Sequence, residues 1–156
     1  LSDDIIGGQV GGSIKNVYAI GCGIVDGINY GQSAVAALLT RAIVEMARFC
    51  EYVGGQKETI FGLSGLGDAI LTCNSELSRN FVTGLLIGRG KKINEIIKSK
   101  KTVAEGVINS KTIFKLSKKK KIEMPVCGSV YKILYKKNKI KETIEKILTR
   151  DIKKEN

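Results

Sequence analysis

Residues 32–53, QSAVAALLTRAIVEMARFCEYV, carry the clearest structural signal in this sequence. Apolar side chains recur there at spacings of three and four residues, which is the period of one face of an α-helix. These positions are Val35, Leu38, Leu39, Ala42, Ile43, Met46, Cys50 and Val53. Ser33 is placed to cap the start of the helix, and Gly54 and Gly55 can end it, because glycine adopts the left-handed backbone conformation without a steric penalty. We expect a long amphipathic helix whose apolar stripe faces the core.

The rest of the chain also favours helices. It contains a single proline, Pro125, whereas sandwiches and barrels need many turn residues between short strands. Shorter helices are expected at about 57–62, 66–73, 78–88, 91–99, 107–117, 128–137 and 139–149, with an extended break at Met124 and Pro125. The pattern of residues 13–28 is compatible with helix or strand, because small residues alternate with residues of high strand propensity. The sequence therefore predicts an all-α fold with one ambiguous segment.

Length and composition are those of one globular domain. The chain has 156 residues, of which 43% are apolar and 6% aromatic, and this is enough for one hydrophobic core. No stretch reaches the roughly 18 apolar residues of a membrane helix, and the first residues do not show the basic and apolar regions of a signal peptide, so we expect a cytoplasmic protein without membrane insertion. Because the chain starts at Leu1 and not at a methionine, we interpret it as a fragment.

The cysteines do not form a metal or redox pattern. No two of them make a CxxC pair, and the chain has no histidine. The four are Cys22, Cys50, Cys73 and Cys127. This excludes a zinc site and a thioredoxin-type dithiol. We expect buried, reduced thiols and no metal; a framework of two disulfides is the alternative.

Positive charge is concentrated in the last third of the chain. Residues 111–156 carry 15 Lys and Arg against 5 Asp and Glu, while the net charge of the whole chain is +11. One interpretation is a basic helical module that binds nucleic acid. The other is a solvated helical surface in a lysine-rich protein, which we favour because few aromatic residues are available to stack on bases. Nucleic acid is therefore not an expected partner.

A glycine-rich segment at residues 21–27, GCGIVDG, follows an apolar run as a phosphate-binding loop would. Its third glycine comes one residue too late for the GxGxxG fingerprint, and no second strand with a ribose-binding carboxylate follows. We interpret these glycines as small residues that let two helices approach closely.

Lys15 stands out because it lies in a segment of apolar and small residues, GGSIKN. In a chain without histidine, acid–base chemistry near neutral pH needs a lysine, cysteine, tyrosine or carboxylate with a shifted pKa. A partly buried lysine is a good candidate. The alternative is a surface lysine whose aliphatic stem alone is buried.

Two later segments also combine glycines with polar groups. GLSGLGDAILTC at residues 62–73 places Asp68 and Thr72 four apart, on one face of a helix; a helix cap is the alternative role for Asp68. The SRN triplet at residues 78–80 precedes an apolar stretch and offers backbone N–H groups and a guanidinium to an anion such as phosphate. Simple capping beside a surface arginine is the alternative there.

Taken in order, four segments of the sequence resemble the carboxy-terminal domain of bacterial NAD(P)-dependent glycerol-3-phosphate dehydrogenases. They are GGSIKNVYAIGCGIVDG, SAVAALLTRAIVEMARF, FGLSGLGDAILTCNSELSRN and TVAEGV, and the likeness spans about residues 3–107. The resemblance implies an all-α, multi-helix substrate domain of the 6-phosphogluconate-dehydrogenase C-terminal-like type, with residues 13–28 helical. It also implies a short extended connector, or last-strand remnant of a missing Rossmann domain, at 1–12, the helical domain at 13–150 and a polar tail at 151–156.

The same resemblance implies roles for individual residues. Lys15 would be the catalytic general acid–base that acts on the substrate oxygen. The implied substrate-binding residues are Lys15, Asp68, Thr72, Ser78, Arg79 and Asn80, and the implied cofactor-binding residues are Arg79, Val103 and Glu105.

The implied reaction is hydride transfer between NADH or NADPH and carbon 2 of dihydroxyacetone phosphate. The product is sn-glycerol 3-phosphate, a precursor for glycerophospholipid biosynthesis. The resemblance makes the chain the substrate-binding and acid–base half of this enzyme, with the missing Rossmann domain as its partner, and we expect it to be inactive alone. The choice between NAD and NADP, and a homodimer as the assembly, are left open by the sequence.

Overall fold

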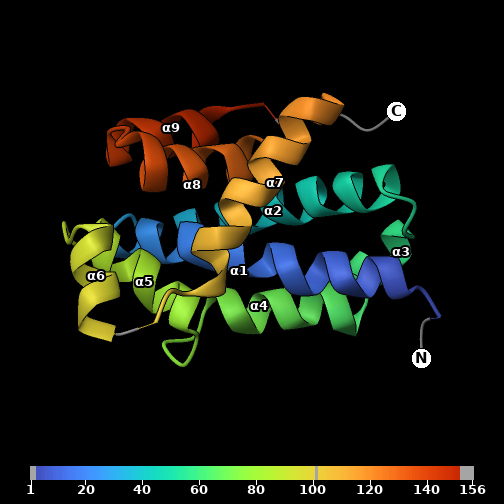
Figure 1. Cartoon of the computed structure of the whole chain (residues 1–156), viewed down its shortest axis with the longest axis horizontal. Coiled ribbons are helices and arrows are strands. Elements are labelled where there is room, and N and C mark those ends of the chain that lie inside the picture. Colours follow the sequence, from blue (N-terminus) through green and yellow to red (C-terminus); the bar gives the residue numbers. More distant parts are fainter. Residues whose placement is uncertain (1–2, 101, 152–156) are drawn as a thin grey trace.

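The computed structural model describes residues 3–100 and 102–151. The first two residues of the expected connector and the last five of the expected polar tail lie outside this description. Within the described residues the secondary structure is entirely helical. The two longest helices, α1 (Ile5–Gly27) and α2 (Gln32–Tyr52), lie side by side at the centre of the molecule (Figure 1). The predicted all-α fold and the predicted long helix, here α2, are therefore confirmed.

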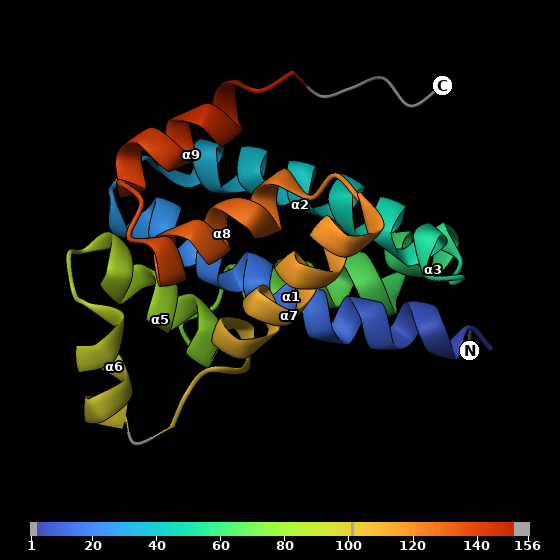
Figure 2. The ribbon, with the colours of Figure 1, turned by 45° about the horizontal axis from the view of Figure 1, so that its top comes forward.

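The remaining elements are shorter. They are α3 (Lys57–Phe61), a π-helical turn η1 (Leu63–Gly67), α4 (Asp68–Cys73), α5 (Arg79–Gly88), α6 (Ile93–Lys100), α7 (Glu105–Lys120), α8 (Pro125–Lys136) and α9 (Ile140–Thr149). In Figures 1 and 2, α8 and α9 cover one side of the α1–α2 pair, while α4 and α5 lie on the other. Helix α7 crosses α1 steeply (Figure 1).

Helix α1 is the centre of the core. Its side chains from Val17 to Ile20 are inaccessible to solvent, and Ile14 and Ile24 are at most 1% exposed. From Ile14 to Gly27 nearly every residue of α1 is buried, with only Lys15 and Asp26 partly exposed. A helix segment with so narrow a polar face lacks the amphipathic period of a surface helix. This explains why residues 13–28 were ambiguous between helix and strand on local pattern alone.

The expected extended connector is wrong for residues 5–12, which form the first turns of α1. The side chain of Asp4 caps this helix: it accepts the N–H of Gly7 at 2.9 Å and that of Gln56 at 2.8 Å, and these bonds lower the pKa of Asp4. The glycines allow a close neighbour, since a Cβ on Gly55 would lie 3.0 Å from the nitrogen of Gly7. Capping and packing thus outweigh the roughly 1 kcal/mol that each glycine costs inside a helix.

Two expected helix boundaries also need correction. Ser33 does not cap α2: the helix begins at Gln32, and the N-cap position is held by Gly31 with its left-handed φ of +87°. The predicted end is confirmed by Gly54, whose φ is +93°. Pro125 is not part of an extended break but the first residue of α8, where its missing N–H leaves no helical hydrogen bond unmade.

The glycine-rich segment at residues 21–27 lies where α1 crosses α5, as a small-residue contact would require. A Cβ on Gly23 would lie 2.1 Å from the carbonyl oxygen of Phe81, and one on Gly84 would lie 2.0 Å from that of Ile20. Any larger residue would push the two helices apart. The predicted helix–helix contact is confirmed, and it fixes the start of α5 beside α1.

All four cysteines are buried and free, as predicted. None of the helices in the described ranges is both long enough and apolar enough to span a bilayer.

Candidate functional site

An open cavity of about 370 Å³ lies between α1, the α4–α5 segment and the start of α7. Its lining residues are mostly polar and come from three parts of the sequence that lie far apart. The lining residues are Asn16, Leu71, Thr72, Ser75, Leu77, Ser78, Arg79, Asn80 and Glu105. Four residues of the predicted substrate site therefore meet at one cavity with two of the predicted cofactor site, Glu105 and Arg79, the latter belonging to both. We call the residues that line this cavity, together with the neighbouring Lys15 and Asp68, the Lys15 face.

Lys15 and Asp68 form an ion pair next to the cavity. Lys15 projects from α1 and Asp68 is the first residue of α4, and their side chains are 21% and 43% exposed. The alternative role of Asp68 as a helix cap is wrong, because its carboxylate is bonded to the lysine and makes no capping bond. An ammonium has three donors, so Lys15 can hold a further oxygen while it is bonded to Asp68.

Neither member of the pair lines the cavity itself, but each is adjacent to a residue that does. Asn16 follows Lys15 in the chain, and Thr72 lies one helical turn after Asp68. The hydroxyl of Thr72 donates to the backbone oxygen of Asp68 at 2.8 Å. Thr72 is thus oriented by its own helix.

Cys73 lies behind the ion pair, with its sulfur 3.9 Å from the carbonyl oxygen of Lys15. A hydrogen bond with Cys22 and burial raise the pKa of the Cys73 thiol. Only a thiolate is an effective nucleophile or metal ligand, so this cysteine contributes packing and no chemistry. The described residues contain no cluster of three metal-binding side chains.

The SRN triplet occupies the start of α5. Ser78 caps the helix by accepting the N–H of Phe81 at 3.3 Å. The side-chain oxygen of Asn80 accepts the N–H of Gly106 at 2.8 Å, which fixes the orientation of the amide and leaves its NH₂ group as the donor. Arg79 is exposed at the cavity and forms no ion pair within the described ranges. One wall of the cavity therefore offers an amide donor and an available guanidinium.

Asn16 is a cavity residue that sequence reasoning missed. Its amide nitrogen donates to Glu105 at 3.1 Å and to the carbonyl oxygen of Gly12 at 3.4 Å. These bonds leave the amide oxygen of Asn16 as an acceptor. The approach of α7 requires a glycine, since a Cβ on Gly106 would lie 2.5 Å from the backbone oxygen of Asn16. The signal that could have identified Asn16 is its position directly after Lys15, as a polar residue in an apolar helix.

Val103 is the one predicted site residue that stands apart. It precedes α7, is 38% exposed and does not line the cavity. The predicted neighbours Glu105 and Arg79 do line it.

Two exposed leucines line the cavity. Leu71 and Leu77 are 71% and 95% exposed. Leu63, at the start of η1, is 92% exposed but is not among the lining residues. Large aliphatic side chains gathered at one exposed site usually mark a surface that another protein part covers. The Lys15 face thus combines polar groups with an apolar border.

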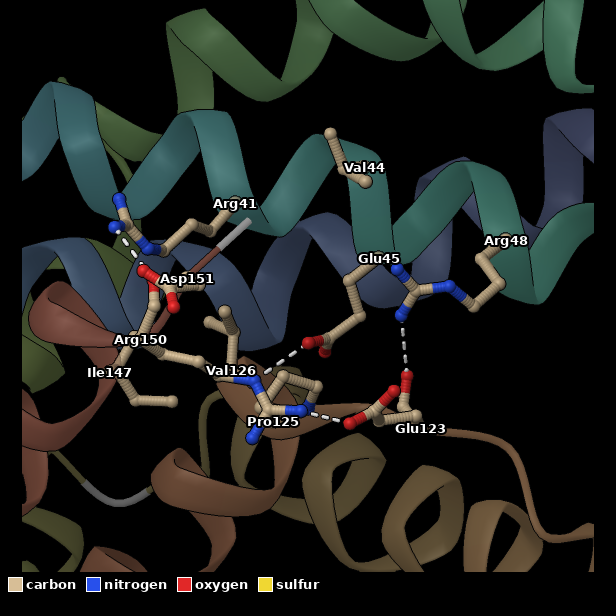
Figure 3. A pocket seen from close by; sticks show the side chains of 10 residues that line it. All are labelled: Arg41, Val44, Glu45, Arg48, Glu123, Pro125, Val126, Ile147, Arg150 and Asp151. Carbon is tan, nitrogen blue, oxygen red and sulfur yellow. Dashed lines mark hydrogen bonds and ion pairs between the residues drawn. The ribbon is translucent and has the colours of Figure 1, made fainter. Parts of the chain in front are cut away.

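A second group of charged residues lies on the side of the α1–α2 pair that α8 and α9 cover, where α2 faces the start of α8 and the end of α9 (Figure 3). Its central residue, Glu45, is 2% exposed. The carboxylate accepts the N–H groups of Val126 and Cys127 at 2.7 and 2.9 Å and the hydroxyl of Tyr18 at 3.1 Å. Burial raises the pKa of Glu45 to about 7, although these hydrogen bonds oppose the shift.

Arginines surround Glu45 and bond to the protein itself. Arg48 donates to the backbone oxygen of Glu123 at 2.9 Å, and Arg150 forms an ion pair with the Glu123 carboxylate (Figure 3). Arg41 donates to the backbone oxygen of Leu148 at 2.8 Å. The hollow between them has a volume of only about 50 Å³. The Glu45 cluster, which we define as Glu45 with these three arginines and Glu123, joins α2 to α8 and α9.

Comparison with known proteins gives a consistent result. The family described as "NAD-dependent glycerol-3-phosphate dehydrogenase C-terminus" matches residues 4–145. Glycerol-3-phosphate dehydrogenase (NAD(P)+) of Pelodictyon phaeoclathratiforme is 41% identical over 99% of this chain and 46% of its own length. The Clostridium tetani protein of the same name is 44% identical over 99% of this chain and 44% of its own length.

Solved structures agree with these relatives. The crystal structure of glycerol-3-phosphate dehydrogenase from Coxiella burnetii matches with a TM-score of 0.92 and 40% identity, over 96% of this chain and 46% of that one. The Saccharomyces cerevisiae enzyme matches with a TM-score of 0.86 and 28% identity, over 94% and 43%. The chain thus spans about half the length of the curated relatives it matches.

Proposed function

The chain belongs to the NAD-dependent glycerol-3-phosphate dehydrogenase C-terminal family, and on this premise we propose that it is the substrate-binding and acid–base half of such an enzyme. The whole enzyme would interconvert dihydroxyacetone phosphate and sn-glycerol 3-phosphate with NAD or NADP. The observation that carries the proposal is the Lys15–Asp68 ion pair, placed beside a cavity that also presents Arg79 and Asn80.

Arg79 and Asn80 suit a phosphorylated substrate. A guanidinium can bind a phosphate through two parallel, charge-assisted hydrogen bonds, and that of Arg79 forms no ion pair with described residues. The amide NH₂ of Asn80, oriented by Gly106, donates a further hydrogen bond to a substrate oxygen. The amide oxygen of Asn16 accepts a hydrogen bond from a substrate hydroxyl.

Lys15 performs the proton transfer. In the reduction, its ammonium donates a hydrogen bond to the carbonyl oxygen at carbon 2 of dihydroxyacetone phosphate. Negative charge develops on this oxygen as carbon 2 gains the hydride, and Lys15 then gives it the proton. In the oxidation, the neutral amine removes the hydroxyl proton. Asp68 holds the Lys15 nitrogen in place in both directions.

The dinucleotide would supply or accept the hydride. The residues of this chain fit only the edge of such a cofactor, since the cavity is open and the exposed carboxylate of Glu105 and guanidinium of Arg79 lie at it. These two residues, with Val103 nearby in the sequence, would contact the dinucleotide. Its main binding surface would belong to another half of the enzyme.

The exposed leucines fit that arrangement. Leu71 and Leu77 would be covered by the Rossmann half, which would close the cavity and exclude water from the hydride transfer. The first turns of α1, residues 5–12, would connect that half to the helical substrate domain. We place the complete enzyme in the cytoplasm, in glycerophospholipid biosynthesis.

A chimera tests the acid–base assignment. This chain would replace the carboxy-terminal half of the Coxiella burnetii enzyme, which has the same fold. With dihydroxyacetone phosphate present, we expect the chimera to oxidise NADH or NADPH, and Lys15→Met to lower turnover by about 10²–10⁴-fold. The control is Lys57→Met, which removes a half-exposed lysine paired with Glu51 and should not change turnover. A Lys15→Met chimera that keeps most of its turnover rules out the role of Lys15.

The isolated chain tests whether catalysis needs the dinucleotide-binding half as well as this helical domain. Because it lacks the main dinucleotide-binding half, we expect no measurable oxidation of reduced cofactor when the purified polypeptide is mixed with dihydroxyacetone phosphate. Rapid oxidation by the chain alone would show that the helical domain is sufficient for catalysis.

A further inference from the structure

A second open groove lies where the ends of α5 and α8 meet the starts of α6 and α9. These helix ends are on the left in Figure 2. Its volume is about 510 Å³, within the range of roughly 300–1,000 Å³ that small-molecule sites occupy. We call it the α6–α9 groove. It shares no residue with the Lys15 face.

The floor of the α6–α9 groove is aliphatic. Ile87, Ile133 and Leu134 lie at its base and are only 6–8% exposed. Ile93 and Ile140 stand at its sides and are partly buried. Among the residues that the structure places around the groove, none is aromatic. The floor therefore suits an alkyl chain better than a nucleic-acid base, which binds by stacking on aromatic rings.

The rim of the groove is positively charged. Lys91, Lys92 and Lys137 are exposed and line it, while no described aspartate or glutamate does. The carboxylate of Glu95, outside the lining, accepts the backbone N–H of Lys92 at 3.4 Å. None of these lysines forms an ion pair in the part of the chain that the structure describes. Three ammonium groups without an ion pair around one hollow attract an anion. An anionic ligand would provide each of them with a direct charged partner.

We propose that the α6–α9 groove binds a single-chain amphiphile with a phosphate headgroup, an alkyl or acyl phosphate. The alkyl chain of the ligand lies on the aliphatic floor, and its phosphate bonds to the lysines of the rim. Inorganic phosphate leaves the floor in contact with water, and a neutral lipid leaves the lysines without a partner. An amphiphilic phosphate satisfies both parts of the groove.

Methyl NMR locates the ligand on the protein. The 156-residue chain, labelled at its isoleucine δ1 methyl groups, would be titrated with hexyl, octyl and decyl phosphate below their micelle concentrations. We expect the largest shifts at Ile87, Ile93, Ile133 and Ile140. Ile5 is 73% exposed on α1 and reports adventitious binding of alkyl chains to any apolar surface. Shifts at Ile5 as large as those in the groove would overturn the proposal.

The length of the ligand's alkyl chain tests whether the aliphatic floor binds it. Each buried methylene should increase the affinity about three- to fourfold until the chain fills the groove. Inorganic phosphate should bind at least tenfold more weakly than octyl phosphate. Equal affinities for inorganic and alkyl phosphates, or no binding at millimolar ligand, would refute the site.

Charge substitutions test the rim. Lys91→Gln combined with Lys137→Gln should weaken octyl phosphate about tenfold, since charge-assisted hydrogen bonds are lost. The control pair, Lys119→Gln with Lys120→Gln on α7, removes the same charge from exposed positions outside the groove and should change affinity less than twofold. An equal loss in both pairs would refute a specific rim.

A second copy of the chain is the competing occupant. In that case the groove isoleucines would shift with protein concentration in the absence of any ligand, and this result would also overturn the proposal. Since the groove is separate from the Lys15 face, failure here leaves the proposed enzyme function unchanged, and loss of that function leaves this binding measurable.

Discussion

Asp68 and Glu45 are both carboxylates bonded to groups from another helix, but their surroundings differ. Asp68 is 43% exposed, pairs with Lys15 and lies beside an open cavity. Glu45 is 2% exposed, and its carboxylate accepts hydrogen bonds from two backbone N–H groups and one hydroxyl inside the protein. Lys15, the partner of Asp68, therefore stays accessible to a ligand. The hydrogen bonds of Glu45 instead hold α2 against α1 and the start of α8.

The difference has an energetic consequence. An ion pair that solvent reaches contributes little to stability, with a median of about 0–1 kcal/mol. Removing a buried charged group that other groups depend on typically costs about 3–5 kcal/mol. Substitutions in the Lys15 face should therefore lower activity with little effect on the free energy of unfolding. Substitutions in the Glu45 cluster should mainly lower the free energy of unfolding.

The largest effect on folding is expected from Glu45→Ala. The substitution leaves the N–H groups of Val126 and Cys127 and the hydroxyl of Tyr18 without a partner. We expect the free energy of unfolding, measured in urea by circular dichroism, to fall by about 3–5 kcal/mol. Glu51→Ala, on the same helix but exposed, is the control and should change it by less than about 0.5 kcal/mol. A loss below about 1 kcal/mol for Glu45→Ala contradicts the structural role.

The next effect is a pH dependence that belongs to Glu45. Burial raises its pKa from 4.5 to about 7 in the folded protein, so the native state binds a proton that the unfolded state releases. This contribution is complete below about pH 4.5 and is lost as pH rises through about 7. By linkage, it is worth roughly 2–3 kcal/mol between pH 5 and pH 8.

Glu45→Gln isolates this contribution, because glutamine does not titrate. Urea unfolding at pH 5 and pH 8 should show a larger difference in unfolding free energy for the wild type than for Glu45→Gln. Equal differences in the two proteins would mean that Glu45 keeps the same pKa when the chain unfolds.

These two regions also differ in how far sequence could predict them. The helical period of α2 and the order of the glycine-rich and polar motifs depend on neighbouring residues, so the fold class and most of the Lys15 face could be predicted. The start of α1 could not, because glycine propensity there is overcome by the Asp4 cap and by packing against Gly55.

Glu45 illustrates what local pattern leaves out. It lies within α2 and bonds to Val126 and Cys127, which are more than 80 residues away in the chain. A glutamate inside an amphipathic helix is ordinarily solvent-exposed, and no spacing rule connects it to the start of a helix that far away. Asn16 was missed for a related reason, since its partner Glu105 is 89 residues distant.

A smaller change in stability is expected when the Lys15–Asp68 pair is removed. Lys15→Met and Asp68→Asn, singly and together, should each change the unfolding free energy of the chain by no more than about 1 kcal/mol, and the coupling energy from the double-mutant cycle should also lie between 0 and 1 kcal/mol. In the chimera, the same Lys15 substitution should abolish most of the turnover. A coupling energy above about 2 kcal/mol would place this pair in the same structural class as Glu45.

The smallest effect on the isolated chain is expected for Leu77→Ser. Leu77 is 95% exposed, so its replacement should change the unfolding free energy by less than about 0.5 kcal/mol. Leu38→Ala is the contrasting control: Leu38 is 2% exposed in the core, and such truncations cost about 2–5 kcal/mol.

In the chimera the same Leu77→Ser substitution should no longer be neutral. If the Rossmann half covers the exposed leucines, burial of one leucine side chain is worth about 1.5–3 kcal/mol, and the loss should appear as a lower melting temperature of the chimera and a higher KM for dihydroxyacetone phosphate. A substitution that is silent in both contexts would show that this border of the Lys15 face stays exposed to water. The Lys15 face would then differ from the Glu45 cluster only in its accessibility, and its leucines would need another explanation than domain docking.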